Sequence, residues 1–336
     1  MKSSKRISIT DVAKKANVSI TTVSRVINKV STVDKQIAAR VEEVIAELKF
    51  RPNPTAQRLA KGGIGSAVGF VIPGFPGIFH SFYAVELMRG IGHGCETQHL
   101  DLIFYITDGK SPLRSSYAGG LIFADIIENR SQVEDALADG MPALIINHLV
   151  KDLNVSYIAV DNIKGGVIAA EYLISLGHKR IATVTGNMQT QAGIDRYEGF
   201  QKTLMKKGID FNTEYFFKGD YSRRSAREAA AHFFSLENPP TAIFAASDDM
   251  ALEIISVAHE NGIKVPEDIS VIGFDDNPAG LFGSVALTTV KQPLFAMGEE
   301  AVKIIYEAMQ SKGQTLVQKV LSPDLIIRES CAPPSS

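Results

Sequence analysis

The chain has 336 residues, 45% of them hydrophobic and 21% charged, a composition that fits a globular protein of two or three domains and excludes a disordered or fibrous chain. Its first ten residues are basic and polar, and no later stretch approaches the ~18 uninterrupted apolar residues of a membrane span. Its two cysteines, Cys95 and Cys331, lie far apart and give no disulfide framework, so we expect a cytoplasmic protein without a signal peptide.

The formal charge of −2 divides into two opposed parts. Residues 1–61 hold thirteen lysines and arginines against five acidic residues, a net charge of +8. The rest of the chain holds 22 basic and 32 acidic residues, a net charge of −10. A basic N-terminal segment on an acidic body indicates a module that binds a polyanion, joined to a part that binds another partner.

The basic segment predicts three short helices. The first spans 9–16 with Ser8 as its N-cap, and the second spans 20–28 with Ser19 as its N-cap; Asn17 suits the tight turn between them. A third helix is expected over about 34–48. The apolar side chains of the three helices fall on faces that would form one core, as in a helix-turn-helix: Ile9, Val12, Ala13, Val18, Val23, Val26, Val33, Ile37, Val41, Val44, Ile45 and Leu48.

The second helix leaves short polar and apolar side chains on its outer face. Such side chains reach base edges and the thymine methyl in the major groove, and Arg25 suits guanine or phosphate. Any two amphipathic helices joined by a polar turn share this pattern, but the N-terminal position and the charge of +8 favour DNA binding. The outward residues are Ile20, Thr21, Thr22, Ser24 and Arg25.

Residues 50–60 are the most specific stretch of the chain. The motif Pro52-Asn53, Ala56 and Leu59-Ala60, together with the run that ends Thr22-Val23-Ser24-Arg25-Val26-Ile27-Asn28, resembles the DNA-binding head and hinge of the lac-repressor (LacI/GalR) family. The resemblance implies a short hinge helix that orders on the operator and wedges Leu59 into the minor groove. Pro54 suits a first helical turn, and an exposed apolar wedge is useful only where it unstacks DNA. The alternative is a linker whose Leu59 packs on the next domain.

The DNA-binding candidates combine the helix pattern with this resemblance. They are Ser8, Ser19, Ile20, Thr21, Thr22, Ser24, Arg25, Asn28, Asn53, Thr55, Ala56 and Leu59.

Beyond residue 63 the pattern changes to apolar runs alternating with amphipathic segments. Seven runs predict buried parallel strands of a doubly wound α/β fold: 67–72, 102–106, 120–123, 143–146, 180–184, 242–245 and 269–274. In such sheets ligands bind beyond the carboxyl ends of the strands. Polar groups and aromatics follow these strands, including Phe79, Phe82 and Tyr83, and this mixture suits a sugar.

The resemblance continues along nearly the whole chain, through motifs such as Val160-Asp161-Asn162, Arg196-Tyr197-Glu198-Gly199-Phe200, Ser247-Asp248-Asp249 and Gly273-Phe274-Asp275-Asp276. It implies a two-lobed core similar to periplasmic sugar-binding proteins, with Arg196 and Asp275 as the main sugar ligands and Asn147 and Ser247 beside them. Ser247 replaces the more usual Asn or Asp, which leaves the identity of the sugar open.

The resemblance also implies a division of the chain into three parts. A helix-turn-helix DNA-binding domain would span 1–50, a hinge 51–63 and an effector-binding core 64–330. Within the core, an N-lobe would comprise about 64–160 and 291–321, and a C-lobe about 161–290 and 322–330.

The segment 107–119 is too short for the crossover helix that the family has at this place. We therefore expect either an exposed apolar sheet surface or a remodelled dimer contact in the N-lobe. No apolar heptads follow the core, so a two-fold dimer that reads a palindromic operator is expected rather than a tetramer.

Catalysis and metal binding have no support in the sequence. Positions 93, 95 and 99 cannot converge on one metal. No glycine-rich motif follows a strand and opens a helix, as a dinucleotide-binding motif must. The pairs Asp248-Asp249 and Asp275-Asp276 could be an acid and a base for glycoside hydrolysis, but Asp275 is explained as a hydroxyl ligand. We expect the second aspartate of each pair to cap the helix that follows.

The sequence thus predicts a DNA-binding transcriptional regulator, a repressor of carbohydrate-use genes controlled by a small sugar. The sign of that control, induction or co-repression, stays open. The alternative is a co-repressed regulator that responds to a purine or a phosphoprotein. A sugar-binding transport protein is disfavoured because it would need a signal peptide and no basic head.

Overall fold

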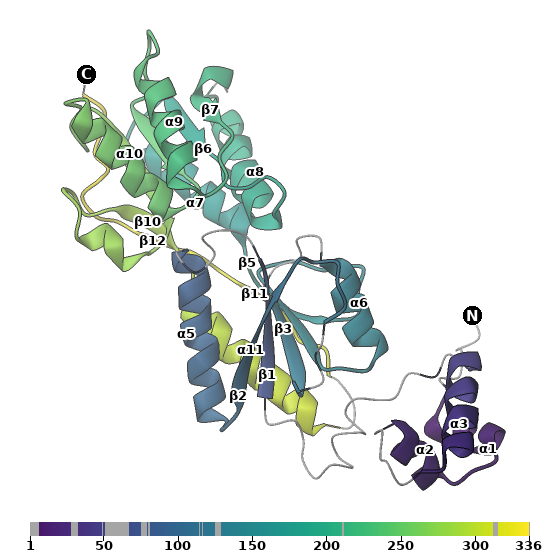
Figure 1. The fold of residues 1–336 in the computed structure, drawn as a ribbon. Coiled ribbons are helices and arrows are strands. Elements are labelled where there is room, and N and C mark those ends of the chain that lie inside the picture. The colour runs from purple at the N-terminus through teal and green to yellow at the C-terminus, as the bar shows by residue number, and fades with distance from the viewer. Residues whose placement is uncertain are drawn as a thin grey trace.

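The computed structural model describes a three-helix head and a core of two α/β lobes (Figure 1). The described residues are 7–27, 33–48, 50, 67–74, 79, 81–113, 115, 117–124, 129–209, 212–311 and 315–335. No helix within these ranges is long and apolar enough to cross a membrane.

The head consists of α1 (Ile9–Ala16), α2 (Ile20–Ile27) and α3 (Lys35–Glu47), which confirms the predicted helix-turn-helix. Asn17 takes the left-handed conformation at φ 53°, which ends α1 and turns the chain toward α2. Val12, Val23 and Val41 are fully buried where the three helices meet. Phe50, the last residue of the predicted domain 1–50, joins this core from beyond α3.

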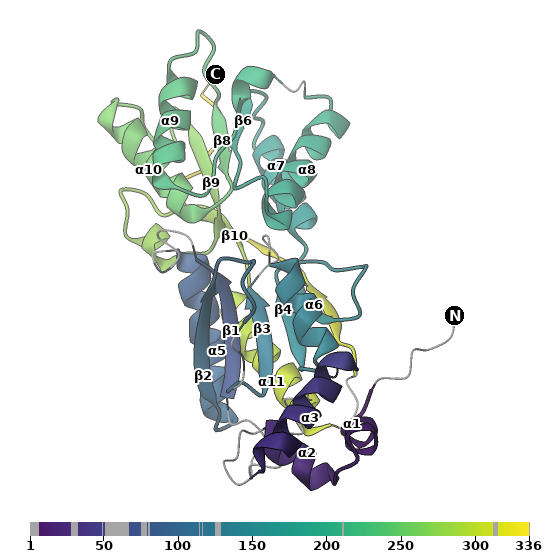
Figure 2. The same ribbon diagram turned by 45° about the vertical axis from the view of Figure 1, so that its right-hand side comes forward.

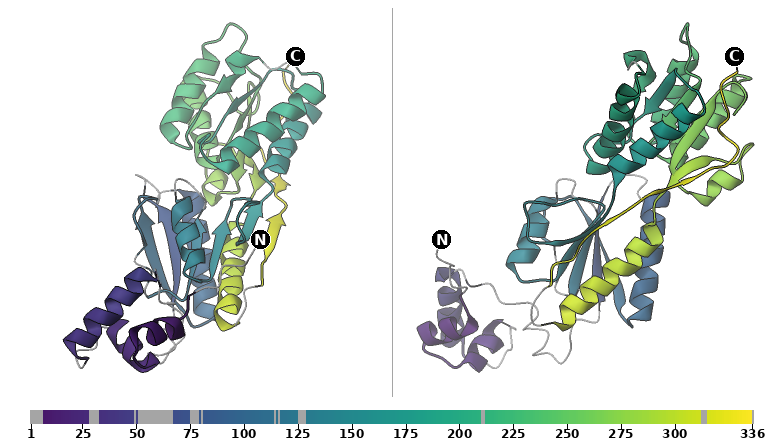
Figure 3. Two further views of the ribbon diagram at one scale, coloured as in Figure 1. Left: turned by 90° about the vertical axis from the view of Figure 1, so that its right-hand side faces the viewer. Right: turned by 180° about the vertical axis from the view of Figure 1, so that it is seen from behind.

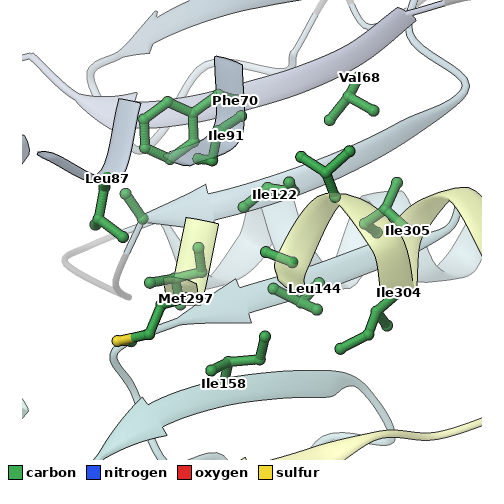
Figure 4. Close-up of a cluster of buried hydrophobic side chains, with 14 of the residues drawn as sticks. Val68, Phe70, Leu87, Ile91, Ile122, Leu144, Ile158, Met297, Ile304 and Ile305 are labelled. Atoms are coloured by element: carbon green, nitrogen blue, oxygen red, sulfur yellow. The ribbon is translucent and has the colours of Figure 1, made fainter. Parts of the chain in front are cut away.

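The N-lobe is built on a parallel sheet in the order β11-β5-β4-β3-β1-β2. Its strands are β1 (Ala67–Pro73), β2 (Asp101–Thr107), β3 (Gly120–Ala124), β4 (Ala143–Ile146), β5 (Ser156–Val160) and β11 (Gln318–Leu321). One face is covered by α5 (Phe82–Thr97) and α11 (Leu294–Gln310), and the other by α6 (Arg130–Ala138). Figure 4 shows the apolar cluster under α5 and α11, with Val68, Phe70, Leu87 and Ile305 among its members.

The C-lobe repeats this plan on a second sheet, in the order β12-β10-β9-β8-β6-β7. Its strands are β6 (Ile181–Val184), β7 (Phe216–Phe217), β8 (Ala242–Ala245), β9 (Ser270–Asp275), β10 (Thr288–Lys291) and β12 (Asp324–Ile326), of which only β12 pairs antiparallel among the described strands. Its helices are α7 (Asn162–Ser175), α8 (Gln191–Lys206), α9 (Arg223–Phe234) and α10 (Asp248–Glu260), with the short helices η2 (Thr213–Tyr215) and η3 (Pro278–Leu281). The helices α7 and α8 cover one face of the sheet, and α9 and α10 cover the other (Figure 2).

The chain passes between the two sheets three times. The passages lie between β5 and α7, between β10 and α11, and between β11 and β12. Figure 3 shows the last passage as a long segment that runs from one lobe to the other. The two-lobed fold with parallel sheets is therefore confirmed, and the carboxyl ends of both sets of parallel strands point toward the passages.

The short connection between β2 and β3 contains no helix in its described residues. The expectation that this leaves the neighbouring apolar face of the sheet exposed is wrong. Val71, Leu121 and Phe123 lie on the sheet face that the absent helix would cover, yet all three are buried. They pack with Tyr105, Leu113 and Ala118 from β2 and the connection itself, so side chains of the loop replace the missing helix.

The loop is held in place by a buried side chain of α6. Gln132 donates from Nε2 to Thr107 Oγ1 at 2.6 Å and to the Ser111 carbonyl at 2.5 Å. The edge strand β2 instead exposes Phe104 and Ile106, at 44% and 59%, on the opposite side of the sheet, where α5 leaves them uncovered. A remodelled dimer contact remains a prediction.

Candidate functional site

A buried ion pair lies at the carboxyl ends of the C-lobe strands. Arg196 on α8 and Asp275 at the end of β9 are only 3% and 8% exposed, and Arg196 Nη1 lies 3.8 Å from Asp275 Oδ1. The guanidinium sits 3.7 Å from the centre of the Phe274 ring and also donates from Nη1 to the Ala246 carbonyl at 2.6 Å. The cation is thus stacked and oriented by the C-lobe itself.

Asp275 is further held by Gln292, which lies on the passage between β10 and α11. Gln292 Nε2 donates to Asp275 Oδ1 at 2.5 Å. Burial raises the pKa of Asp275 to about 7, although Arg196 and Gln292 both favour its charged form. Among the described residues Gln292 Oε1 is buried and has no hydrogen-bond partner, so the site presents an acceptor for a hydroxyl or amide donor.

A pair of asparagines connects this C-lobe pair to the N-lobe. Asn162, at the start of α7, accepts from Arg196 Nε at 2.9 Å through its Oδ1. Its Nδ2 donates to the Val160 carbonyl at 3.2 Å and approaches Asn147 Oδ1 at 3.5 Å. Asn147 follows β4 of the N-lobe and is buried. The polar contacts therefore run from one lobe to the other through Asn162.

Strained backbone marks the same region. Four non-glycine residues with φ between 61° and 124° stand at or near strand ends around the pair, namely Asn147, Tyr221, Asp275 and Asp276. Such conformations cost about 1–3 kcal/mol each and gather at functional sites. Tyr221 lies against Gly186, where a Cβ would come within 2.0 Å of the tyrosine ring, and its ring centre is 6.0 Å from the Arg196 guanidinium.

The aromatic candidates of the N-lobe are not the rings that contact Arg196. Phe82 and Tyr83 form the first turn of α5, where they are half-buried and pack against the N-lobe core. Phe79 is described as 48% exposed. The rings that flank Arg196 are Phe274 and Tyr221 of the C-lobe.

The head presents a second candidate site on α2. Ile20 is 48% exposed, Thr21 and Arg25 are also exposed, and Thr22 and Ser24 are half-buried. Ser19 accepts from the Thr22 backbone N–H at 3.0 Å, and Ser8 bonds Asp11 in a capping box, so both hydroxyls already cap a helix. Asn28, Asn53, Thr55, Ala56 and Leu59 lie outside the described residues.

Comparisons with known proteins show the family of the chain. Residues 8–53 match the family described as bacterial regulatory proteins, lacI family, and residues 170–331 match a periplasmic binding protein-like domain. The HTH-type transcriptional regulator DegA of Bacillus subtilis (strain 168) is 32% identical, over 98% of this chain and 99% of that protein. The chain belongs to the LacI family. The HTH-type transcriptional repressor PurR of Histophilus somni (strain 129Pt) is also 32% identical, over 96% of this chain and 98% of that protein.

Solved structures of LacI-family regulators have the same fold. The complex of the transcriptional regulator CelR with cellobiose has a TM-score of 0.74 at 27% identity, over 97% of this chain and all of that one. The lac repressor dimer bound to operator and the anti-inducer ONPF has a TM-score of 0.71 at 25% identity, over 98% of this chain and all of that one. This LacI-family chain is therefore a DNA-binding transcriptional regulator and not an enzyme.

The aspartates of the two acidic pairs make hydrogen bonds and ion pairs within the C-lobe. The prediction that Asp249 and Asp276 cap the helices that follow them is wrong. Ser247 caps α10 by accepting from the Met250 N–H at 3.4 Å, and Asn277 caps η3. Asp248 is buried and accepts from the Asn277 N–H at 2.7 Å and from Thr289 Oγ1 at 2.6 Å, with a pKa well above 3.8 because of its burial.

The second aspartate of the other pair bonds two cations. Asp276 accepts from Arg328 Nη2 at 2.5 Å and lies 3.2 Å from Lys291 Nζ.

No group of three possible metal ligands occurs among the described residues of the protein.

Four side chains of the site were missing from the sequence-based candidates, among them Phe274, which was predicted only as the end of a strand. Asn162 stands in a motif that was noticed, and its position directly after a passage between lobes could have singled it out. Gln292 follows β10, a strand that was not predicted, and Tyr221 follows the two-residue strand β7. Without those strands, the rule that ligands gather at strand ends could not point to these residues.

Proposed function

We propose that this LacI-family regulator is a cytoplasmic, homodimeric repressor of carbohydrate-use genes that reads a palindromic operator. A small sugar bound between the lobes, around Arg196 and Asp275, would control its affinity for the operator. The head would comprise residues 1–50, the hinge 51–63 and the two-lobed core 64–330. The lac repressor dimer bound to operator and the CelR–cellobiose complex, both similar over almost the whole chain, support this assembly and this class of ligand.

The observation that carries the proposal is the chemistry around the buried ion pair. A carboxylate, a guanidinium and amides held at fixed positions suit neighbouring hydroxyl groups, and the aromatic rings of Phe274 and Tyr221 add apolar surface. The unpartnered Gln292 Oε1 accepts a further hydroxyl.

The mechanism is a linkage between two conformations. The effector binds both lobes, changes the angle between them and so changes the distance between the two hinges of a dimer. Reciprocity requires that operator binding changes effector affinity by the same factor. Either sign of this coupling fits the site.

A purine is the second candidate effector, because its N–H groups suit a carboxylate and its carbonyl and unprotonated ring nitrogens suit amide N–H donors. The 32% identity to a repressor named PurR supports testing it beside the sugars.

A thermal-shift panel tests the effector class. Mono- and disaccharides, sugar phosphates and purines are added to the purified protein, to Asp275→Ala and to the surface control Glu237→Ala. A ligand at 100 times its Kd stabilises the native state by about 2.7 kcal/mol, which is easily measured as a rise in Tm. We expect one sugar to raise the Tm of wild type and of Glu237→Ala but not of Asp275→Ala. A response to purines alone would replace the sugar, and an equal response in Asp275→Ala would contradict the assigned site.

A further inference from the structure

Two consecutive residues with strained backbone end β9 beside the proposed effector site. Asp275 and Asp276 have φ of 124° and 61°, in the region that residues other than glycine rarely adopt. Asp275 is the last residue of β9 and pairs in register with Lys291, the last residue of β10. The chain leaves the sheet at this place, so the conformation of the turn decides where the carboxyl group of Asp275 points. Such a conformation persists only where surrounding contacts hold it.

The side chain of Asp276 binds one cation with each of its oxygens. Oδ1 accepts from Arg328 Nη2 at 2.5 Å, and Oδ2 lies 3.2 Å from Lys291 Nζ. The carboxylate and the guanidinium are only 17% and 16% exposed, so water screens this pair less than a surface pair. Arg328 is itself held, because its Nη1 donates to the Leu287 carbonyl at 2.8 Å and its N–H donates to Thr288 Oγ1 at 2.9 Å. Asp276 is therefore bonded through Arg328 to the start of β10, the strand beside β9.

The same two backbone segments carry the contacts of the effector site and those of this outer ion cluster of Asp276, Lys291 and Arg328. Asp275 and Gln292 are buried and meet in the site, where Gln292 Nε2 donates to Asp275 Oδ1 at 2.5 Å. Their chain neighbours Asp276 and Lys291 form an ion pair that is open to water, with the Lys291 side chain 49% exposed. A change in the outer pair therefore reaches the inner pair through one peptide unit in each segment.

We propose that Asp276 is a positioning residue of the effector site: the outer ion cluster holds the strained turn and so keeps the carboxyl group of Asp275 facing Arg196. Without the cluster the turn relaxes, and Asp275 moves toward water. Figures 1 and 2 both show β10 at the junction of the lobes. Lys291 directly precedes the second passage and Arg328 follows β12, where the third passage ends, so the cluster also joins two of the passages. This role of Asp276 rests on the proposed effector site, in which Asp275 is a ligand.

The test follows the ionisation of Asp275 in the full chain without any effector. Unfolding by denaturant is measured between pH 5 and pH 8 with Asp275 and with Asp275→Asn, and the difference between the two profiles is the part that Asp275 contributes. This part is compared in wild type, Asp276→Asn, Arg328→Met and Lys291→Met. Asparagine tolerates the left-handed backbone, so Asp276→Asn removes the charge and keeps the preference for the turn. Glu260→Gln is the matched control, because Glu260 also binds an arginine with both oxygens but lies at the other end of α10.

Positioning and a direct effect of charge predict different patterns in these variants. The other charged groups that interact with Asp275 are Arg196 on α8 and Asp248 and Asp249 on α10, and they are the same in every variant. By charge alone, the loss of the negative Asp276 lowers the pKa of Asp275 and shrinks its part of the profile. By charge alone, the loss of either cation raises that pKa and enlarges the part. Only positioning shrinks the part in both kinds of variant.

We expect Asp276→Asn and Arg328→Met to shrink the part that Asp275 contributes by about half or more, because a carboxyl group that reaches water titrates nearer to its ordinary pKa of 3.8. Lys291→Met should shrink it less, and Glu260→Gln should leave it unchanged. The half-exposed Lys291 keeps the test decisive if Arg328→Met does not fold.

A part that falls by less than half in Asp276→Asn, or that grows in a cation variant, would overturn the proposal. The absence of such a part in wild type would also overturn it, because Asp275 would then not be held away from water. The sugar panel decides separately whether Asp275 binds an effector, so the two proposals fail independently.

Discussion

Arg25 in the head and Arg196 in the core are both candidate ligand contacts, but they stand in opposite environments. Arg25 is exposed on α2 beside Ile20 and Thr21. Arg196 is buried, stacked on Phe274 and bonded to Asn162 and Ala246 before any ligand arrives. The candidate DNA contacts Ile20, Thr21 and Arg25 are exposed and lie outside the buried core of the head, whereas the candidate effector ligands Arg196 and Asp275 are also buried contacts of the core.

The largest effect that separates the two regions is expected for Arg196→Ala. The change removes the cation from a buried carboxyl and leaves Asn162 Oδ1 and the Ala246 carbonyl without their donor. The free energy of unfolding of the core should fall by about 3–5 kcal/mol. Arg25→Ala should change the free energy of unfolding of the head by less than about 0.5 kcal/mol. Denaturant titrations of both variants check this difference, and equal losses would contradict it.

The next largest effect is a pH dependence that belongs to the cleft alone. The pKa of Asp275 is about 7 in the folded chain against an ordinary value of 3.8, so between these values the folded state binds the proton more tightly. The free energy of unfolding should therefore fall as the pH rises from about 4 to about 7, by about 2.5 kcal/mol between pH 5 and pH 8. Asp275→Asn should remove the part of this slope that Asp275 contributes, while Asp248, whose pKa is also raised by burial, keeps its own part and Glu237→Gln keeps the whole slope. Parallel pH profiles for wild type and Asp275→Asn would refute the assignment.

For the head, Leu59→Ala is expected to lower the affinity for operator DNA without changing the stability of the protein. The loss of a minor-groove wedge should weaken specific operator binding about 10- to 100-fold, because the energy of the bent operator is lost while the phosphate contacts remain. Fluorescence anisotropy with specific and random duplexes at one salt concentration measures both affinities. Equal losses on the two duplexes would show that Leu59 is only part of a linker.

The smallest expected effect is that of Ser19→Ala. Its hydroxyl caps α2 by accepting from the Thr22 N–H, so the head should lose about 1 kcal/mol of stability. Ser19→Asp keeps an acceptor and should restore it. A variant that loses DNA affinity with no change in head stability would assign Ser19 to DNA and not to the cap.

The same contrast explains how much the sequence could predict. The head depends on contacts between residues close in the chain, so caps, turn and apolar spacing gave α1, α2 and α3 to within one residue in their described parts. In the core, strong apolar runs gave seven strands, but β5, β7, β10, β11 and β12 were missed. The missed strands have only two residues, as in β7, or contain polar and charged side chains that shorten the apolar run, as in β10 and β11. Gln292 and Tyr221 were missed with them, because the cleft is assembled from segments far apart in the chain.

Operator affinity with and without an effector tests the central claim most directly. The protein first selects its own operator from random duplexes, and its affinity for that operator is then measured with and without the compound that raises its Tm. The account predicts a change of at least tenfold, of either sign, in wild type and in Glu237→Ala, and less than twofold in Asp275→Ala. An effector that binds wild type without changing its operator affinity would contradict control of the head by the cleft.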